Sequence, residues 1–213
     1  MKSIVWLLLL FSLFSLTADD VALKTEKKLL SLDSVKADFE QVYYSGSVST
    51  PLRERGKFTF RKPDSMKWEY KDPEEKIFLF KKGNFFFYDP EENQLMKGSF
   101  SEEDPEAEIF NLLSGKKSLR VHYIIEFSPF PSEKTDVFQL KLTPKDEEEH
   151  SLILLEIDKK TWLIGKAILF DWAGNKNEYR FTKIKTNVRI PKNFFELKLP
   201  PDVEIIEKLK NQK

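Results

Sequence analysis

The chain has 213 residues, of which 33% are charged and none is cysteine. Lysine and arginine together number 35, as do aspartate and glutamate, and a protein without a basic surplus is not typical of nucleic-acid binders. Without cysteine the chain has neither disulfides nor a lipid-modified thiol, so its fold depends on its own hydrophobic core.

The first eighteen residues have the organisation of a secretory signal peptide. Lys2 supplies a positive start, residues 4–16 are almost uninterruptedly apolar, and the small residues Thr17 and Ala18 precede an acidic pair. The apolar run is shorter than the about 20 residues of a membrane-spanning helix, although an uncleaved anchor remains the alternative. We expect cleavage after Ala18, and a soluble, exported chain of one domain, residues 19–213.

Residues 21–32 predict an amphipathic helix that follows the leader, with Leu23, Leu29, Leu30 and Leu32 on its apolar side. Val35, Ala37 and Phe39 then alternate with polar residues, which indicates a first strand.

Residues 56–70, GKFTFRKPDSMKWEY, predict a β-hairpin that turns at Pro63-Asp64. Side chains alternate between the two faces of a strand, so one face is charged and the other mostly aromatic. The aromatic face comprises Phe58, Phe60, Lys62, Met66, Trp68 and Tyr70. Large rings and a lysine on this face, in place of small branched residues, indicate a sheet around an apolar ligand that enters and leaves.

A second helix is expected to interrupt a long series of strands. Asp104 can cap it, Gly115 can end it, and Ile109, Phe110, Leu112 and Leu113 form its apolar side. Residues 146–149 are expected to form a solvated loop, and residues 191–195 a helical turn. The predicted strands are 76–80, 85–88, 94–100, 120–127, 136–143, 151–158, 163–172, 177–186 and 203–206. Their spacing indicates a β-barrel or β-sandwich.

No catalytic constellation emerges from the sequence. His122 and His150 are the two histidines, and nucleophile-elbow, HExxH, phosphate-loop and metal-ligand motifs are missing. Asp171 is better explained as a turn residue before Gly174 than as a catalytic acid. We therefore expect no enzyme, no cofactor and no metal site.

Several short motifs occur in a fixed order along the mature chain. They are FEQ at 39–41, the hairpin block at 56–70, FYDP at 87–90 with Gln94, LLSG at 112–115, LTP at 142–144, Asp171 with Gly174, and FELKLPPDV at 195–203. Through this ordered set the chain resembles the periplasmic outer-membrane lipoprotein carrier family, LolA, over nearly its whole mature length.

The resemblance implies a mainly β (α+β) fold, in which a half-closed, strongly curved antiparallel barrel carries a lid of short helices over an apolar cavity. It implies a monomeric periplasmic chaperone that accepts triacylated lipoproteins from an inner-membrane ABC transporter and delivers them to an outer-membrane receptor. Such a carrier must bury acyl chains, because each methylene exposed to water costs about 0.8 kcal/mol.

The residues that we expect to line this cavity come from the strands and from the second helix. They are Phe39, Phe58, Phe60, Met66, Trp68, Tyr70, Ile109, Phe110 and Leu113. We expect the two helices to fill the mouth when no ligand is bound, although both helices could also simply complete a core. Members of the family usually have a lid-binding arginine immediately before the hairpin proline. Here Lys62 occupies that position and is the expected lid latch, although an ammonium lacks the planar donor geometry of a guanidinium.

Two other functions remain open from the sequence. One is a related exported protein that binds free lipids or glycolipids. The other is a secreted hydrolase, which the missing nucleophile–base pair disfavours.

Overall fold

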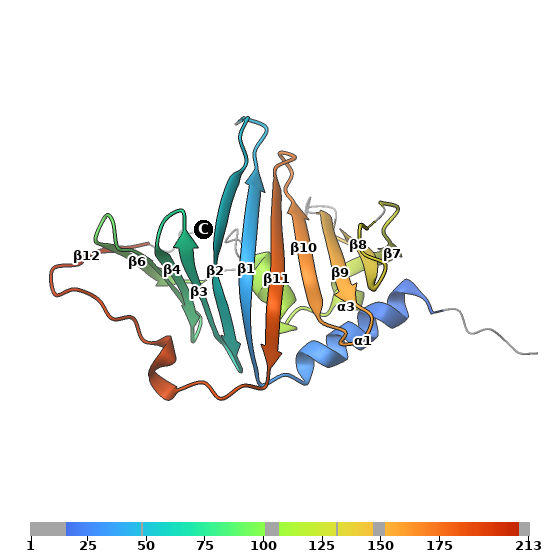
Figure 1. Cartoon of the computed structure of the whole chain (residues 1–213), viewed down its shortest axis with the longest axis horizontal. Helices are drawn as coiled ribbons and strands as arrows, with labels where there is room; N and C mark the ends of the chain where they lie inside the picture. Colours follow the sequence, from blue (N-terminus) through green and yellow to red (C-terminus); the bar gives the residue numbers. More distant parts are fainter. Residues whose placement is uncertain (1–15, 48, 101–106, 131, 147–151, 209–213) are drawn as a thin grey trace, which may run out of the picture.

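The computed structural model describes residues 16–47, 49–100, 107–130, 132–146 and 152–208. All strands in this part of the chain belong to one twelve-stranded sheet, in the order β12-β6-β5-β4-β3-β2-β1-β11-β10-β9-β8-β7 (Figure 1). The strands are β1 Ser34–Tyr44, β2 Leu52–Arg61, β3 Ser65–Asp72, β4 Lys76–Lys81, β5 Asn84–Asp89, β6 Gln94–Ser99, β7 Tyr123–Phe127, β8 Val137–Pro144, β9 Leu152–Asp158, β10 Ile164–Phe170, β11 Lys176–Thr186 and β12 Glu204–Glu207.

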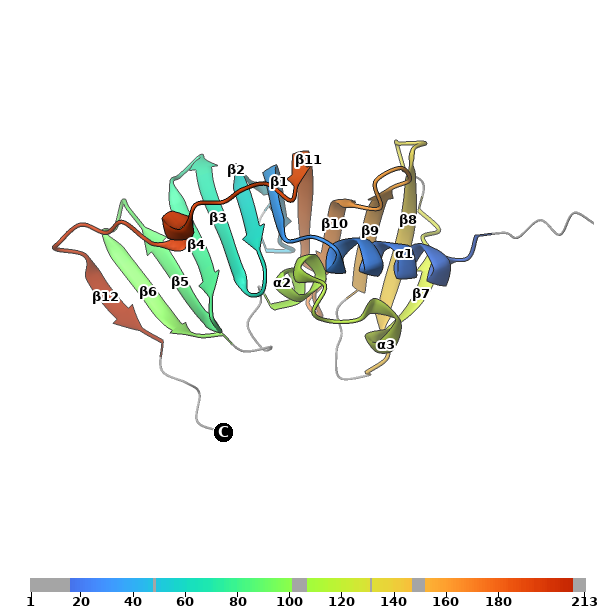
Figure 2. The same cartoon turned by 90° about the horizontal axis from the view of Figure 1, so that it is seen from below.

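The sheet curls without closing, since β12 and β7 form its two separate ends (Figure 2). Neighbouring strands are antiparallel, except that β12 runs parallel to β6. The prediction of a mainly β, half-closed and curved sheet is therefore confirmed, with one parallel pair added at its edge.

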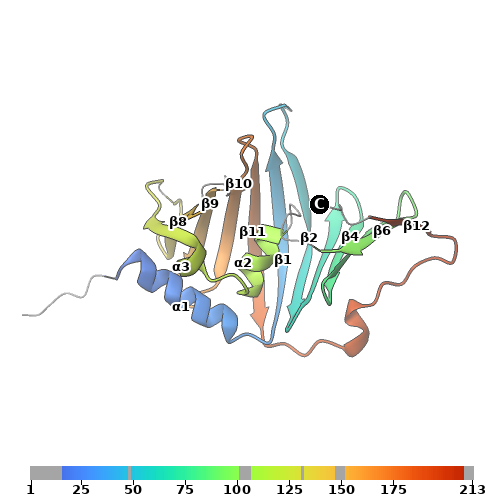
Figure 3. The same ribbon diagram turned by 180° about the vertical axis from the view of Figure 1, so that it is seen from behind.

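Helices α1 Ala18–Leu30, α2 Ala107–Ser114 and α3 Leu119–His122 lie on the concave face (Figures 2 and 3). The segment between β11 and β12, which includes the 3-10 helix η1 Lys192–Phe195, runs over the opposite, convex face. Among the described residues, no helix is long and apolar enough to cross a membrane.

Helix α1 begins three residues before the predicted start at Val21. Thr17 accepts a hydrogen bond from the Asp20 backbone N–H, and the Asp20 carboxylate accepts one from the Thr17 backbone. This capping box satisfies N–H groups that a helix start leaves without partners. Residues 1–15 of the predicted signal peptide lie outside the described residues.

The predicted apolar side of the first helix was partly wrong. Leu29 and Leu32 are buried, but Leu30 is 57% exposed and Leu23 is half-buried. The face that packs inward consists of Val21, Ala22, Thr25 and Leu29. Thr25 follows Val21 and Ala22 by four and three positions, and Leu29 follows Thr25 by four, so the small and polar residues Ala22 and Thr25 belong to the buried face.

The second predicted helix corresponds to α2, and Gly115 ends it with a positive φ of 68°. A Cβ at Gly115 would lie 3.3 Å from the Cβ atom of Leu29, so α1 and α2 approach closely there. Asp104, Pro105 and residues 147–149 of the acidic loop lie outside the described residues.

Residues 120–127 were predicted as one strand, but their first part belongs to α3. Glu26 of α1 accepts hydrogen bonds from the Ser118 hydroxyl and the Arg120 backbone N–H, at 2.9 and 3.3 Å. These bonds hold the start of α3 against α1. Sequence periodicity misses this helix because its anchor lies far away in the chain.

The β2–β3 hairpin is confirmed, but only part of its charged face is open to solvent: Lys57 and Lys71 are exposed, whereas Thr59 and Lys67 are buried. Thr59 is 2% exposed and Lys67 is 8% exposed, and η1 packs against β3 on this face. The Lys67 ammonium lies 5.0 Å from the ring centre of Phe194, and the Arg61 guanidinium lies 4.7 Å from that of Phe195. Both cations thus contact aromatic rings of the C-terminal segment.

Candidate functional site

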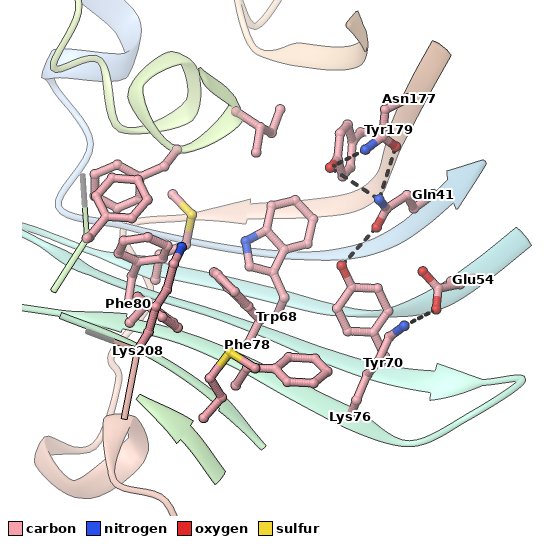
Figure 4. A pocket seen from close by; sticks show the side chains of 17 residues that line it. Gln41, Glu54, Trp68, Tyr70, Lys76, Phe78, Phe80, Asn177, Tyr179 and Lys208 are labelled. Carbon is pink, nitrogen blue, oxygen red and sulfur yellow. Dashed lines mark hydrogen bonds and ion pairs between the residues drawn. The ribbon is translucent and has the colours of Figure 1, made fainter. Parts of the chain in front are cut away.

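A cavity of about 510 Å³ lies on the concave face, between strands β3–β6 and helix α2 (Figure 4). Its lining combines a large aromatic group with a smaller polar one. The lining residues are Gln41, Glu54, Met66, Trp68, Tyr70, Lys76, Phe78, Phe80, Phe85, Phe87, Met96, Phe100, Ile109, Phe110, Asn177, Tyr179 and Lys208.

Six phenylalanines form the apolar end of the cavity. On β4 and β5, Phe78 is directly opposite Phe87 and Phe80 is opposite Phe85, so both cross-strand pairs face inward. Helix α2 closes this end by placing Phe110 on Phe80, with ring centres 4.7 Å apart. The cavity is therefore bounded by rigid rings, which bury much apolar area with few rotatable bonds.

Trp68 lies at the centre of the cavity wall, between Phe80 and Tyr70 (Figure 4). Its ring centre is 4.6 Å from that of Phe58 and 5.5 Å from that of Tyr179. Phe39 meets it edge-on at 4.8 Å. The indole is 4% exposed, so it joins the cavity to the buried core.

The other end of the cavity is polar. The Tyr70 hydroxyl donates to the Gln41 side-chain oxygen at 2.8 Å, and the Gln41 amide donates to Asn177 at 3.0 Å and to Tyr179 at 3.2 Å. The Asn177 amide also donates to the Tyr179 hydroxyl at 2.9 Å. This network connects β3, β1 and β11 across the concave face.

An ion pair lies beside this network. The Lys76 ammonium of β4 pairs with the Glu54 carboxylate of β2 and lies 4.9 Å from the ring centre of Tyr70. Both side chains are largely withdrawn from solvent, at 21% and 10% exposure. The polar end thus offers hydrogen-bond donors and acceptors with no net charge from this pair.

A second, smaller apolar space of about 30 Å³ lies beside the C-terminal end of α1. Leu29, Leu32, Leu113, Phe58 and Phe181 are among its lining residues. Since Trp68 contacts Phe58 and Phe181, its indole lies between this space and the main cavity.

The structure divides the predicted cavity residues among three places. Met66, Trp68, Tyr70, Ile109 and Phe110 line the main cavity. Phe58 and Leu113 line the small apolar space instead.

Phe39 and Phe60 are buried in the core. Phe39 packs over Gly56, where an added Cβ would lie 2.8 Å from the Phe39 ring and 2.1 Å from the Glu69 carbonyl oxygen. The glycine therefore makes room for the ring beneath Trp68 and Tyr70.

Four of the five phenylalanines of β4 and β5 line the cavity and were missed as site residues. Their period-two spacing could have identified them, because Phe78 and Phe80 share one face, as do Phe85 and Phe87. Gln41 and Tyr179 could not be joined in this way. Their contact depends on the pairing of β1 with β11, which places these two residues opposite each other.

Lys62 contacts a helix on the concave face, but that helix is α1 and not α2, which lines the cavity. Its ammonium donates to the backbone carbonyl of Leu30, the last residue of α1. A cation at a helix C-terminus satisfies a carbonyl without a helical partner and interacts favourably with the helix dipole. Arg61 points to the convex face, as expected from its position, and contacts Phe195 there.

Two of the residues considered for catalysis, His122 and Asp171, do not line the cavity. His122 is exposed at the end of α3, and His150 lies outside the described residues. Asp171 accepts hydrogen bonds from the backbone N–H groups of Ala173 and Asn175, both at 2.9 Å, and Gly174 has a φ of 78°. The prediction of a turn at Asp171 is confirmed. In the described part of the chain, no three acidic, histidine or cysteine side chains are grouped to hold a metal.

Comparisons with known proteins agree with this geometry. The family model described as outer membrane lipoprotein carrier protein LolA matches residues 31–198. An outer-membrane lipoprotein carrier protein of Legionella pneumophila (strain Corby) is 27% identical over 204 residues, covering 94% of this chain and 96% of the relative. One of Francisella tularensis subsp. tularensis (strain WY96-3418) is 22% identical over 222 residues, covering 99% of this chain and 98% of the relative.

Solved structures share the fold at low identity. An uncharacterized conserved protein from Thermus thermophilus aligns with a TM-score of 0.57 at 11% identity, covering 90% of this chain and 99% of its own. A DUF1329 family protein from Desulfovibrio piger aligns with a TM-score of 0.50 at 15% identity, covering 84% and 95%.

Proposed function

Because the chain belongs to the LolA family of outer membrane lipoprotein carrier proteins, we propose that it is a periplasmic carrier that binds lipoproteins through their acyl chains. It accepts triacylated lipoproteins released from the inner membrane by an ABC transporter and delivers them to an outer-membrane receptor. It acts as a chaperone without catalytic activity, and it works as a single domain, residues 19–213.

The observation that carries this proposal is the ring-lined cavity on the concave face. Its wall of six phenylalanines and Trp68 is complementary to hydrocarbon. Burial of each methylene contributes about 0.8 kcal/mol, so a long acyl chain supplies on the order of 10 kcal/mol before ordering costs. That is enough to keep a lipid-modified protein out of aggregates while it diffuses.

The size of the cavity limits what the closed form can hold. A methylene group is close in size to a water molecule, which takes about 30 Å³ of liquid volume. The 510 Å³ cavity therefore holds on the order of 17 methylene groups, or one long chain. Three chains require the helices on the concave face to move, so α2 and α1 act as a lid.

Movement of α2 would join the two apolar spaces. Ile109 and Phe110 of this eight-residue helix line the main cavity, while Leu113 lines the small space beside α1. In the empty protein, Phe110 occupies room that acyl chains would take. This competition keeps the affinity low enough for cargo to be passed on, and Lys62 stabilises the closed arrangement through α1.

A second candidate is a carrier of free lipids or glycolipids. The capacity of the closed cavity for about one chain favours this alternative, since a lipid with one or two chains needs less lid movement.

The test is to express the full chain in a Gram-negative host, purify it from the periplasm and identify the bound cargo by native mass spectrometry. We expect triacylated lipoproteins in complex with the mature chain. Free lipid alone would support the second candidate. A wild-type protein that carries neither lipoprotein nor lipid would contradict a carrier role.

A further inference from the structure

The polar end of the cavity has a chemistry that hydrocarbon does not use. We call Gln41, Tyr70, Asn177 and Tyr179, together with the Glu54–Lys76 ion pair, the polar cluster. Its members come from five adjacent strands, β11, β1, β2, β3 and β4, and all line the same cavity (Figure 4). The cluster is thus a continuous polar wall opposite the phenylalanines.

These residues lie on the face of the sheet that carries the apolar lining. Tyr70 follows Met66 and Trp68 at every second position of β3, and Lys76 precedes Phe78 and Phe80 on β4 in the same way. The polar groups of this wall bond to one another, but the N–H donors that they do not use among themselves would face an acyl chain without a partner, which is unfavourable. A cavity for hydrocarbon alone would therefore continue its apolar lining to this end.

Binding pockets commonly combine an apolar wall with a few polar groups that fix the orientation of the ligand. The Tyr70 hydroxyl and the Gln41 amide donate within the cluster, whereas the Asn177 amide carries a second N–H beside the one that it donates to Tyr179. This amide and the Lys76 ammonium can donate hydrogen bonds to carbonyl oxygens. An ammonium carries three N–H donors, more than its pair with Glu54 needs. The cluster therefore matches a ligand that accepts several hydrogen bonds.

The Glu54 carboxylate decides the charge of that ligand. It balances Lys76 at the cavity wall, where its side chain is only 10% exposed. A fatty-acid carboxylate or a phosphate approaching Lys76 would also meet Glu54, and like charges repel strongly where solvent is excluded. The site thus favours a neutral polar group over an anion.

We propose that the polar cluster binds the neutral ester and amide carbonyls that join acyl chains to the cargo. The chains extend from there past Trp68 to Phe80 and Phe110. This assignment rests on the proposed carrier function and adds an orientation: the linkage lies at the polar end, and the chain ends lie under α2.

The experiment measures the affinity of the mature protein for three probes. A tripalmitoylated lipopeptide and a fluorescent diacylglycerol both carry ester carbonyls, whereas diphenylhexatriene is a hydrocarbon dye without hydrogen-bonding groups. The variants are Gln41→Leu and the paired change Glu54→Leu with Lys76→Met, which leaves no uncompensated charge. Tyr70→Phe removes a single hydroxyl and serves if a larger change impairs folding.

The matched controls are residues of β7 and β8 that do not line the cavity. Gln139→Leu removes an amide that donates to Glu156 at 3.3 Å, and Glu126→Leu with Lys141→Met removes an ion pair of 3.3 Å. We expect the cluster variants to weaken both ester probes roughly tenfold, as the loss of one or two hydrogen bonds predicts, and to leave the dye unchanged. The controls should bind all three probes like the wild type.

The possible results separate this assignment from the carrier function. If the cluster variants bind the ester probes like the wild type, or lose the dye equally, the assignment is wrong while the carrier function stands. If the wild type binds the diacylglycerol but not the lipopeptide, and the cluster variants weaken that binding, the assignment holds and the lipoprotein function fails. A wild type that binds only the dye overturns both.

Discussion

Trp68 is a single residue that contacts both the buried core and the cavity. Its indole touches Phe58 and Phe39 on the core side and faces the open cavity on the other. Because it is 4% exposed, any group that replaces it must be compatible with an apolar environment or with the cargo.

We predict that Trp68→Glu lowers the extraction of lipoproteins from membrane vesicles at least tenfold. The substitution places an unpaired carboxylate where acyl chains would lie, and burying a charge without a partner is strongly unfavourable. Far-UV circular dichroism should retain its β signature. Trp172→Glu is the matched control, since Trp172 is 82% exposed and away from the cavity; unchanged extraction by Trp68→Glu would contradict the assignment.

Glu178 of β11 contributes to the stability of the fold and does not line the cavity. Burial raises the pKa of this carboxyl, but a hydrogen bond of 2.7 Å from Arg180 and the nearby charges of Lys166 and Lys176 outweigh burial, so the pKa lies below its usual value. A lowered carboxyl pKa stabilises the fold above the unfolded-state pKa of about 4.3, and the stabilisation is lost as the pH falls through the folded-state value.

Glu178→Gln should therefore lower the free energy of unfolding by about 1–2 kcal/mol at pH 7. The difference from the wild type should shrink as the pH falls below the unfolded-state pKa of about 4.3 and through the lower pKa of the folded-state carboxyl. Urea unfolding at pH 7 and at pH 3.5 measures this directly. A difference that stays constant between the two pH values would show that the ion pairs of Glu178 contribute nothing to it.

Among the elements, α1 and the β2–β3 hairpin are connected by one side chain. Lys62 follows the last residue of β2 and donates to the Leu30 carbonyl at the end of α1. Helix α1 in turn approaches α2 at Leu29 and Gly115. The expected lid latch thus contacts α1 directly and α2 only through the close approach of Leu29 to Gly115.

We predict that Lys62→Leu speeds amide hydrogen exchange about tenfold or more at residues 27–32, and then at residues 109–113. A hydrogen bond from a charged donor contributes about 1.5–3 kcal/mol, and leucine also adds apolar surface for cargo. Release of cargo to an acceptor should slow, and Lys62→Arg should have the opposite effect. Lys57→Leu, an exposed lysine on the other face of β2, is the control. Exchange as slow as in the wild type would place the latch elsewhere.

The segment with η1 acts as a cover for the convex face. Phe195 is 1% exposed, its backbone carbonyl accepts a hydrogen bond from Lys81 at 3.1 Å, and its ring contacts Arg61. The buried ring therefore contributes to the stability of the central strands.

Phe195→Ala should lower the free energy of unfolding by about 3–5 kcal/mol, because it removes a fully buried ring and leaves a cavity. Phe194→Ala is the comparison. Because Phe194 is only half-buried, its replacement should lower the free energy of unfolding clearly less. Urea unfolding at neutral pH tests both variants. Equal losses for the two rings would mean that the segment does not pack as described.

At the scale of the whole molecule, the two faces of one curved sheet have different tasks. The right-handed twist of strands makes an open sheet curl, and here the helices lie within the curve while the C-terminal segment lies outside (Figure 2). In the proposed carrier, the helices would therefore move on one face of the sheet while the C-terminal segment stays on the other.

Export should also change one end of the molecule. Cleavage after Ala18 removes Thr17 and its capping box with Asp20, a loss worth about 1 kcal/mol to the helix start. We predict that N-terminal sequencing of the periplasmic protein returns a start near Asp19, and that ordered α1 begins near Val21 in hydrogen exchange. A Met1 start in a membrane fraction would contradict cleavage.

Period-two alternation is a local property of the chain, so the pattern of residues was enough to predict most strands, the hairpin and the face to which their side chains point. Met66, Trp68 and Tyr70 were correctly placed on the concave face for that reason. The same is true of the apolar helix that ends at Gly115, since helix periodicity and the glycine stop are both local. Period-two alternation failed at residues 120–122, which belong to α3.

Which of these residues contact one another depends on how the sheet and the helices pack. The position of α2 on the curved sheet places Phe110 at the main cavity and Leu113 at the smaller apolar space. Phe60 of β2 lies in the core. The pairing of β1 with β11 joins Gln41 to Asn177, and η1 contacts Lys67. Each depends on contacts between residues far apart in the chain, whose register and curvature no local period of the sequence encodes.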